Sequence, residues 1–331
     1  MRSTQEKLKV AVVGLGKMGL VHASILNTLP EVELVALCDT SSFVRKFCAN
    51  LLLDIDVIDD VAKLSDFDVD IVYITSPIPS HYFIVKKICS LGKPVSLFVE
   101  KTLSSKYEDA LALCSMVREC KSPNMVGYMK RFAVTFNKAK ELLLDNAIGS
   151  ILSFEGHAYS SDFFGVDETS QMSLKRGGVL SDLGSHVIDL ALWFFGDFQV
   201  QPSKPVPTDF RNTVQFKVRN NSAIEGSFDV SWCKEGYHVP EFGLVINGST
   251  GKIAVDDDVI TMKPISGQTT HWFRQDLKDN VGFLLGAPEY FREDEYFVKS
   301  IFKGINPEPS FDSASKVDFI IGKVLEGVEK K

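Results

Sequence analysis

A glycine-rich segment near the N-terminus has the spacing of a phosphate-binding turn. Gly14-Leu-Gly16-Lys17-Met18-Gly19 follows the apolar run Leu8–Val13 and opens a segment with helical periodicity. In such a turn the first glycine permits a tight bend, the second lets the main chain approach a pyrophosphate, and the third allows the helix to pack closely on the strand. The helix N-terminus offers N–H groups to the phosphates. The segment, Lys17 and Met18 included, therefore predicts a dinucleotide site, with a purely structural turn as the alternative.

An acidic residue lies about twenty residues further on, at the end of a second apolar run. Asp39 follows Glu33–Cys38, where a carboxylate accepts hydrogen bonds from ribose hydroxyls and repels a 2′-phosphate. The next residues, Thr40–Ser42, include no arginine to hold that phosphate. The pattern favours NAD over NADP, although Arg45 and Lys46 are near enough in sequence to reach back. The alternative for Asp39 is a helix cap.

A loop rich in proline and serine follows the apolar run Ile71–Ile74. It contains Ser76, Pro77 and His81. Loops at the carboxyl ends of parallel strands line the ligand crevice of such folds, so we expect Ser76 and Pro77 to lie near the cofactor. His81 has two interpretations, as a structural residue of the loop or as a contact of the nicotinamide end.

A charged pair ends the next apolar run, Val95–Val99. Glu100 and Lys101 are placed at the same sheet edge, and we expect both at the cofactor site. A lysine there can hold a substrate hydroxyl, or move a proton if desolvation lowers its pKa. A solvated Glu–Lys ion pair is the alternative.

A third group of reactive side chains lies past the middle of the chain. Asp182, His186 and Asp189 have the spacing i, i+4 and i+7, which would place them on one face of a helix. A histidine beside carboxylates is a plausible acid–base unit, because it titrates near neutrality. A structural histidine is the alternative. The spacing would also suit a metal ion, but no further His or Cys cluster completes a ligand shell, so no metal is predicted.

Together these motifs resemble the Gfo/Idh/MocA oxidoreductases, the family of glucose–fructose oxidoreductase and inositol dehydrogenase. The resemblance covers nearly the whole chain, and the segment from Gly178 to Asp189 is its most diagnostic part. The matching motifs are Gly14–Gly19, Ser76–His81, Glu100-Lys101-Thr102, Gly127–Phe132, Gly178-x-x-x-Asp182-x-Gly184-x-His186-x-x-Asp189 and Leu244–Val255.

The resemblance implies three catalytic residues and a hydride transfer to or from nicotinamide. Lys101 would contact the reacting hydroxyl, His186 would lie close to it, and Asp182 would orient both substrate and histidine. Whether Lys101 or His186 accepts the proton stays open. Thr102 replaces the proline that follows the lysine in the family. Because proline adopts a cis peptide more readily than other residues, we expect a trans peptide here, with a small shift of Lys101.

The order of elements predicts an α/β protein with two domains. Fully apolar strands alternate with helices at first, which indicates a doubly wound parallel sheet of the Rossmann type over residues 1–125. Residues 126–331 show longer alternating strands and predict an α+β domain with a mostly antiparallel sheet, which binds substrate. The family uses the outer face of this sheet to form dimers or tetramers. Phe154, Phe228, Val230 and Trp232 have the alternation to form that face or the internal core.

The composition excludes several classes of protein. The chain has 331 residues and a net charge of −7, with acidic and basic residues interspersed, which disfavours a nucleic-acid surface. It contains no apolar run long enough for a membrane helix, and its polar start lacks the apolar core of a signal peptide. The six cysteines form no C-x-x-C pair. We therefore expect a cytoplasmic enzyme with buried thiols and no membrane partner.

The sequence leaves three functions open. The leading hypothesis is an NAD(P)-dependent dehydrogenase that interconverts a secondary alcohol and a ketone of a sugar, polyol or nucleotide sugar. The alternatives are a non-catalytic NAD-binding regulatory protein with the same fold, and a glycosidase that recycles a bound NAD. The sequence does not identify the sugar or polyol, nor decide between dimer and tetramer.

Overall fold

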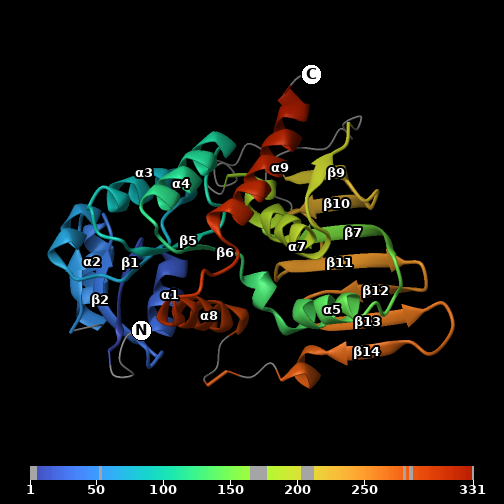
Figure 1. Cartoon of the computed structure of the whole chain (residues 1–331), viewed down its shortest axis with the longest axis horizontal. Helices are drawn as coiled ribbons and strands as arrows, with labels where there is room; N and C mark the ends of the chain where they lie inside the picture. The colour runs from blue at the N-terminus through green and yellow to red at the C-terminus, as the bar shows by residue number, and fades with distance from the viewer. Residues whose placement is uncertain are drawn as a thin grey trace. The chain divides into compact units, whose positions relative to one another are not determined.

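The chain forms two compact units in a computed structural model that describes residues 6–51, 54–164, 177–202, 212–278, 281–282 and 286–329. The first unit combines Met1–Tyr128 with Tyr290–Asp318, and the second combines Met129–Glu289 with Phe319–Lys331. Figure 1 shows the elements of both. The segment Tyr290–Asp318 thus packs with the N-terminal part of the chain, although it follows the second unit's strands in sequence.

The first unit contains a six-stranded parallel sheet with strand order β3-β2-β1-β4-β5-β6. This is the doubly wound arrangement expected from the sequence, and the fold class is confirmed. Its strands are β1 (Leu8–Val13), β2 (Val32–Cys38), β3 (Asp56–Ile58), β4 (Ile71–Ile74), β5 (Ser96–Glu100) and β6 (Asn124–Gly127). Its helices are α1 (Lys17–Leu26), α2 (Ser42–Leu51), α3 (Ile78–Cys89) and α4 (Tyr107–Glu119), with a 3₁₀ turn at Val61–Asp66.

The central strands of this sheet are buried along their whole length. Every residue of β4 and of β5 is buried, which requires cover on both sheet faces and explains the uninterrupted apolar runs in the sequence. β1 pairs with β2 on one side and with β4 on the other. The chain order reverses at this point, so the turns after β1 and β4 lie side by side at the carboxyl edge of the sheet, where doubly wound folds bind ligands.

The second unit contains an eight-stranded sheet with strand order β14-β13-β12-β11-β7-β10-β9-β8. All pairs are antiparallel except β7 with β10, which confirms a mostly antiparallel sheet. Its strands are β7 (Ile151–Tyr159), β8 (Phe198–Val200), β9 (Thr213–Asn220), β10 (Glu225–Ser231), β11 (Glu241–Gly248), β12 (Gly251–Val255), β13 (Val259–Pro264) and β14 (Thr270–Phe273). Its helical segments are α5 (Val134–Leu144), α7 (Ser185–Phe195), a π-helical turn at Leu180–Gly184, and 3₁₀ turns at Met129–Phe132 and Arg274–Leu277.

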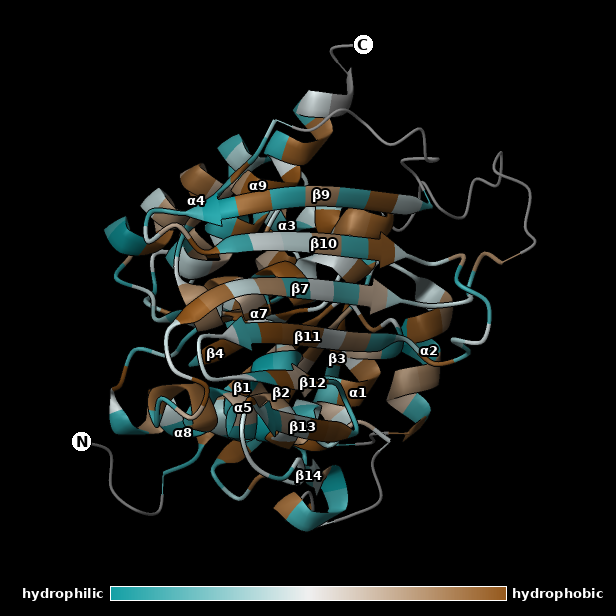
Figure 2. Ribbon diagram, turned by 90° about the vertical axis from the view of Figure 1, so that its right-hand side faces the viewer, coloured by the Kyte–Doolittle hydropathy of each residue, from teal (hydrophilic) through white to brown (hydrophobic). Residues whose placement is uncertain are grey.

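One face of the second sheet forms a core and the other faces solvent. Helix α5 packs on β12 and β13, and α7 packs on β7 and β11. Beneath them Phe154 stacks on Phe195, and Phe216 stacks on Phe228. Phe154, Phe228, Val230 and Trp232 are all buried in this core, which decides between the two interpretations of their alternation. The polar residues that alternate with these core residues therefore lie on the outer face. Figure 2 shows hydrophilic and hydrophobic residues mixed along β9, β10, β7 and β11.

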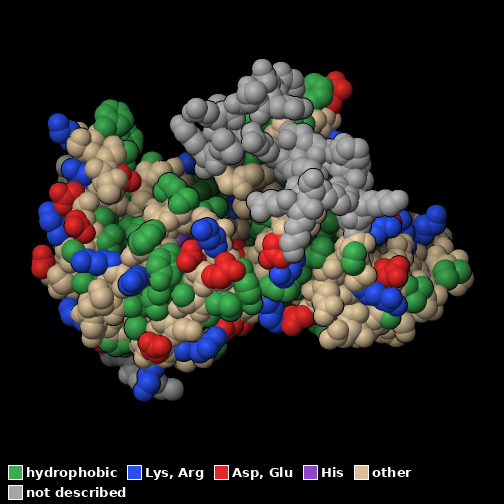
Figure 3. Space-filling model, turned by 90° about the horizontal axis from the view of Figure 1, so that it is seen from above, with side chains coloured by type: hydrophobic (Ala, Val, Ile, Leu, Met, Phe, Trp, Pro, Cys, Tyr) green, Lys and Arg blue, Asp and Glu red, His purple; other side chains and the backbone are tan. Residues whose placement is uncertain are grey.

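Two helices end the chain, α8 (Glu289–Lys303) and α9 (Phe311–Glu329). Helix α8 was not expected from the sequence. None of the helices in the described ranges is long and apolar enough to cross a bilayer. Acidic and basic side chains are interspersed on the face of the described residues that Figure 3 shows, in keeping with the composition. All six cysteines are free thiols, and three of them are buried.

Candidate functional site

The turn after β1 is built on glycines that meet a neighbouring loop. Gly14 has φ +93°, a conformation that side chains with a Cβ rarely adopt. A Cβ at Gly14 would lie 2.6 Å from the main-chain nitrogen of Ser76, so only glycine fits against the loop after β4. The structure thus brings Gly14 and Ser76, two predicted cofactor residues, into direct contact. The hydroxyl of Thr75 adds a hydrogen bond of 2.6 Å to the carbonyl of Gly14.

The other two glycines fit a pyrophosphate-binding turn. A Cβ at Gly19 would overlap the carbonyl oxygen of Gly14, whereas a Cβ at Gly16 would have no atom of the described chain within 4 Å. Gly16 is the N-cap of α1, and no described side chain caps that helix. The first N–H groups, which include those of Lys17 and Met18, therefore stay available to an anion. The open space above Gly16 and the uncapped helix end are what a dinucleotide phosphate needs.

Asp39 is fixed by the main chain beside this turn. One carboxylate oxygen accepts the N–H of Leu15 at 2.7 Å, and the other accepts the N–H of Ser41 at 2.7 Å. Each oxygen keeps a lone pair for a further donor such as a ribose hydroxyl. Arg45 donates from Nη1 to the carbonyls of Asp39 and Thr40, both at 2.8 Å. Arg45 is one of the two residues that kept NADP open as an alternative cofactor. Its side chain is thus held by main-chain carbonyls at and next to Asp39.

His81 links two loops of the same sheet edge. Its ring is fully buried, with Nε2 2.8 Å from the carbonyl of Ser76 and Nδ1 3.0 Å from the carbonyl of Thr102. Burial lowers the pKa of His81, although these carbonyls oppose the shift. Ser76 also shares a hydrogen bond of 2.7 Å with Ser80, while Pro77 is exposed just before α3. These contacts suit a histidine that positions the loops, and direct contact of His81 with nicotinamide stays a prediction.

Glu100 and Lys101 end β5, but they do not form a solvated ion pair. Glu100 is buried, and its two carboxylate oxygens accept separate hydrogen bonds, from Nε2 of His22 at 3.0 Å and from the main-chain N–H of Lys101 at 3.0 Å. Burial alone would raise the pKa of Glu100, but the hydrogen bond and charge of His22 lower it below its ordinary value. Lys101 is half-buried at the sheet edge. The peptide between Lys101 and Thr102 is cis, so the expected trans peptide was wrong.

In the second unit, Asp182 and His186 lie where a helix changes its winding. Asp182 belongs to the π-helical turn Leu180–Gly184, and His186 lies in the first turn of α7. A continuous α-helix over Asp182–Asp189 was expected, whereas its first turn is π-helical. Such π turns recur at functional sites. His186 is buried, and its ring packs edge-on against Phe242 with centroids 5.0 Å apart.

Asp189 forms an ion pair, which gives it a different role from the one expected for Asp182. Its carboxylate accepts two hydrogen bonds from Arg131, from Nε at 2.7 Å and from Nη2 at 2.6 Å. Asp189 is 1% exposed, so this bidentate pair is almost completely desolvated. The pair ties α7 to the 3₁₀ turn Met129–Phe132 and so fixes the helix that carries His186.

A second buried cation lies near His186 and was not assigned from the sequence. Lys130 donates to Asp257 at 2.7 Å and to Glu289 at 2.9 Å, and its Nζ lies 5.1 Å from the ring centre of Phe242. Burial alone would lower the pKa of Lys130, but the two carboxylates raise it. Phe242 thus contacts both Lys130 and His186. Lys130 was visible in the Gly127–Phe132 motif, whereas nothing in the local sequence marked Phe242.

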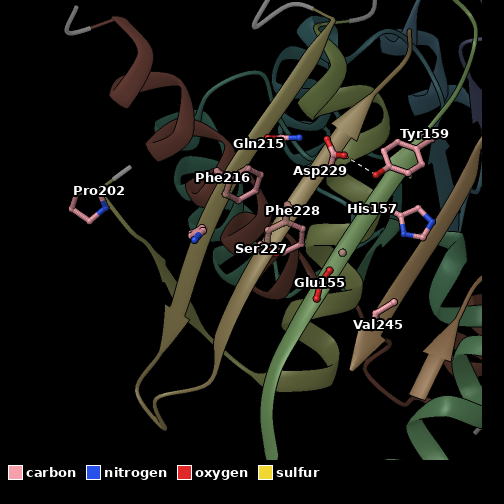
Figure 4. A pocket seen from close by; sticks show the side chains of 12 residues that line it. Glu155, His157, Tyr159, Pro202, Gln215, Phe216, Ser227, Phe228, Asp229 and Val245 are labelled. Carbon is pink, nitrogen blue, oxygen red and sulfur yellow. Dashed lines mark hydrogen bonds between the residues drawn. The ribbon is translucent and has the colours of Figure 1, made fainter. Parts of the chain in front are cut away.

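The outer face of the second sheet carries a depression of about 680 Å³. Figure 4 shows side chains of β7, β9, β10 and β11 around it, among them Glu155, Gln215 and Ser227. The hydroxyl of Tyr159 donates to Asp229 at 2.7 Å. The depression is thus lined by both polar and apolar residues.

Two family profiles match most of the chain. Residues 8–128 match the Gfo/Idh/MocA oxidoreductase family with an NAD-binding Rossmann fold, and residues 136–254 match the Gfo/Idh/MocA C-terminal domain. The first match includes Lys101, and the second includes Asp182 and His186.

Individual proteins give the same picture. The chain is 25% identical to inositol 2-dehydrogenase of Rhizobium meliloti over 321 residues, 92% of this chain and 91% of that protein. It is 26% identical to scyllo-inositol 2-dehydrogenase (NAD(+)) of Bacillus subtilis, but this match covers 58% of the chain and only 55% of the relative. The solved structure of levoglucosan dehydrogenase with NADH and levoglucosan superimposes with a TM-score of 0.84 at 21% identity, covering 98% of both chains. The last likeness shows a shared fold.

The desolvated pair of Arg131 and Asp189 gives a first prediction. Asp189→Asn leaves the buried guanidinium without its anion, and we expect a loss of about 3 kcal/mol in the free energy of unfolding. The matched control is Glu141→Gln, which removes an exposed carboxylate bonded to Lys138 and should cost no more than about 0.5 kcal/mol. Urea unfolding monitored by circular dichroism measures both. Equal stability of the two variants would contradict a structural role for the Arg131–Asp189 pair.

Proposed function

The chain belongs to the Gfo/Idh/MocA family of NAD-binding oxidoreductases, and we propose that it is an NAD-dependent dehydrogenase of a sugar or polyol. The observation that carries the proposal is the carboxyl edge of the first sheet. Here the turn Gly14–Gly19, the carboxylate of Asp39 and the segment Glu100-Lys101 follow strands β1, β2 and β5 of one parallel sheet. One bound dinucleotide would use the first two, and a substrate hydroxyl the third.

Different site residues would bind different parts of the cofactor. Main-chain N–H groups of Gly16, Lys17 and Met18 would hold the pyrophosphate, and Asp39 the adenosine ribose. Ser76, Pro77 and Glu100 would line the nicotinamide end, with His81 holding their loops. When bound, NAD supplies a hydride acceptor at its nicotinamide ring. The protein then has two tasks left, to orient the substrate carbon and to receive a proton.

The relatives support a substrate with adjacent hydroxyl groups. One acts on inositol by name, and a structural neighbour was solved with the sugar derivative levoglucosan. In such a reaction the carbon loses a hydride, its hydroxyl loses a proton, and a ketone forms. We assign Lys101 to the reacting hydroxyl, His186 to proton transfer with it, and Asp182 to orientation of the histidine and substrate. Which of Lys101 and His186 receives the proton is a question for the pH profile of each variant.

The proposed assembly is a homodimer or homotetramer through the outer face of the second sheet. That face is open, carries the depression described above, and presents polar side chains such as Glu155, Ser227 and Gln215. An isologous contact there would be polar, with hydrogen-bonded pairs rather than an apolar core.

The role of Lys101 predicts a selective loss of turnover. Lys101→Ala should lower kcat on the best substrate at least about 100-fold, because it removes the group that holds the reacting hydroxyl. Binding of NADH, followed by its fluorescence, should change little. The measurement is NADH formation across a panel of inositols, aldoses and anhydrosugars.

The control variant for this experiment is Lys93→Ala, an exposed lysine before β5 that should keep wild-type kcat. Full turnover by Lys101→Ala would contradict the site assignment. Tight NADH binding by the wild type without turnover on the whole panel would instead favour a regulatory protein, and release of free sugar without net NADH a glycosidase.

The carboxylate of Asp39 predicts the cofactor preference. Asp39→Asn keeps an acceptor for the N–H of Leu15 but removes the negative charge, so repulsion of a 2′-phosphate should fall. We expect the ratio of NADP to NAD affinity to rise about 10-fold, with Arg45 close by to receive the phosphate. Titration with the two reduced cofactors measures the ratio. The exposed Asp54→Asn serves as control, and an unchanged ratio in Asp39→Asn would reject the assignment.

The proposed interface predicts that a substitution on the outer face of the second sheet changes the mass of the assembly in solution. Ser227→Arg places a long cation beside the depression and should shift the mass measured by light scattering toward the monomer. Ser65→Arg makes the same exchange at an exposed position of the first unit and should leave the mass unchanged. A wild-type protein that is monomeric at micromolar concentration would refute the proposed assembly.

A further inference from the structure

A cluster of buried ionisable side chains surrounds His22 in the first unit. His22 lies on α1, Glu100 at the end of β5, and Glu293 and Asp294 on α8. His22, Glu293 and Asp294 have no exposed surface, and Glu100 is 8% exposed. Nδ1 of His22 lies 2.8 and 2.9 Å from the two oxygens of Asp294, and Nε2 lies 3.0 Å from Oε1 of Glu100. One imidazole ring therefore bridges two carboxylates from distant parts of the chain.

The geometry suits a donor on each ring nitrogen. A neutral imidazole has only one N–H, so it would present a lone pair to one of the two carboxylates, whereas an imidazolium donates to both. Burial alone would lower the pKa of His22, but the charges and hydrogen bonds of Asp294 and Glu100 raise it well above 6.5. Glu293 on α8 adds a further carboxylate, and Lys101 is the cation that faces Glu100.

Aromatic rings shield this bridge from water. The ring centre of His22 lies 5.1 Å from that of Phe98, 5.6 Å from that of Tyr73 and 5.9 Å from that of Tyr290. In such low-dielectric surroundings hydrogen bonds between charged groups are strengthened, and a rotation of the imidazole ring would break both.

The bridge continues to the main chain of Lys101. Glu100 uses Oε1 for His22 and Oε2 for the N–H of Lys101, so the orientation of its carboxylate is set from both sides. Beyond Lys101, His81 contacts the carbonyls of Thr102 and Leu103. The segment that carries Lys101 is thus anchored by one buried histidine before it and another after it.

We propose that His22 is a positioning residue for the reaction, a buried imidazolium that joins Asp294 of α8 to Glu100 and so fixes the main chain of Lys101. The inference rests on the proposed function of Lys101. It makes α8, which follows the whole second sheet in sequence, part of the support of the reacting site. Asp294 is linked to Lys101 through His22 and Glu100, which makes it the most informative position for a test.

The first test separates positioning from cofactor binding. Asp294→Asn keeps the shape of the side chain and removes the charge that faces Nδ1. We expect kcat to fall about 10-fold, because small displacements of a catalytic group are costly, while KM for NAD stays within about two-fold. Asp312→Asn is the matched control, since it removes an exposed carboxylate paired with Arg118 in the same unit. A kcat for Asp294→Asn equal to that of the control overturns the proposal.

The second test does not depend on turnover or on the Asp294→Asn variant. The full-length wild-type protein, labelled with ¹⁵N-histidine, is followed by NMR from about pH 6 to 9, and the His22 signal is the one missing in His22→Gln. We expect both ring nitrogens to be protonated at pH 7, because the pKa of His22 is raised well above 6.5, near which ordinary histidines titrate. A neutral ring at pH 7, or titration near pH 6.5, overturns the proposal even if Asp294→Asn fails to fold.

Metal analysis of the same sample completes the test. The ligand atoms of His22, Glu293 and Asp294 lie within 4.8 Å of one another, a spacing that a cation would also accept. We expect no stoichiometric metal, and one that is lost in His22→Gln overturns the imidazolium. If no sugar or polyol is turned over and Lys101→Ala is without effect, the proposed function fails, while the NMR result still decides the state of His22.

Discussion

The close main-chain contact between the turns after β1 and β4 is the constraint on which the first site depends. Gly14 can meet the nitrogen of Ser76 only without a Cβ, and Gly19 can meet the carbonyl of Gly14 only on the same condition. This contact sets where α1 begins, and the start of α1 sets the direction of its N–H groups. Asp39 then uses the N–H of Leu15, inside that turn, to fix its own carboxylate. The residues proposed for the cofactor therefore form one contiguous assembly rather than a set of independent contacts.

The second unit has a different task, which is to hold a histidine in a buried place. Asp182 lies in the π-helical turn before α7, and the bidentate pair of Arg131 and Asp189 fixes the helix that carries His186. Phe242 fills the space beside the ring and is itself covered by Lys130. Because Arg131 and Lys130 are adjacent in sequence, one short 3₁₀ turn supplies both buried cations. The support of His186 thus depends on a segment about 55 residues before it in the chain.

The sequence predicted the parts of the molecule whose signals are local. Glycine spacing, apolar runs and the acid after β2 placed most of the first sheet and the glycine-rich turn to within a few residues, but not the short edge strand β3. Contacts between residues that are distant in sequence were missed. His22 and Asp294 are 272 residues apart, and α8, which carries Asp294, was not expected. Asp189 matched helical spacing with His186, yet a pairing with Arg131 decided its role. The alternation of Phe154 and Phe228 was equally consistent with either sheet face, since alternation alone does not say which face α5 and α7 cover.

The buried charges explain how a chain of net charge −7 can be suited to an anionic cofactor. Several of its acidic groups are buried beside an internal cation, as Glu100 and Asp294 are beside His22, Asp189 beside Arg131, and Asp257 and Glu289 beside Lys130. Each such carboxylate has its field largely cancelled at short range, so the formal charge overstates the potential that an approaching phosphate meets. Asp39 is the exception among the first unit's site acids, because its partners are main-chain N–H groups, which bring no full positive charge. An uncompensated carboxylate at that position acts selectively, since ribose hydroxyls donate to it and a 2′-phosphate does not. The choice between NAD and NADP then follows from the lack of a counter-ion at this one carboxylate, and not from the net charge of the chain.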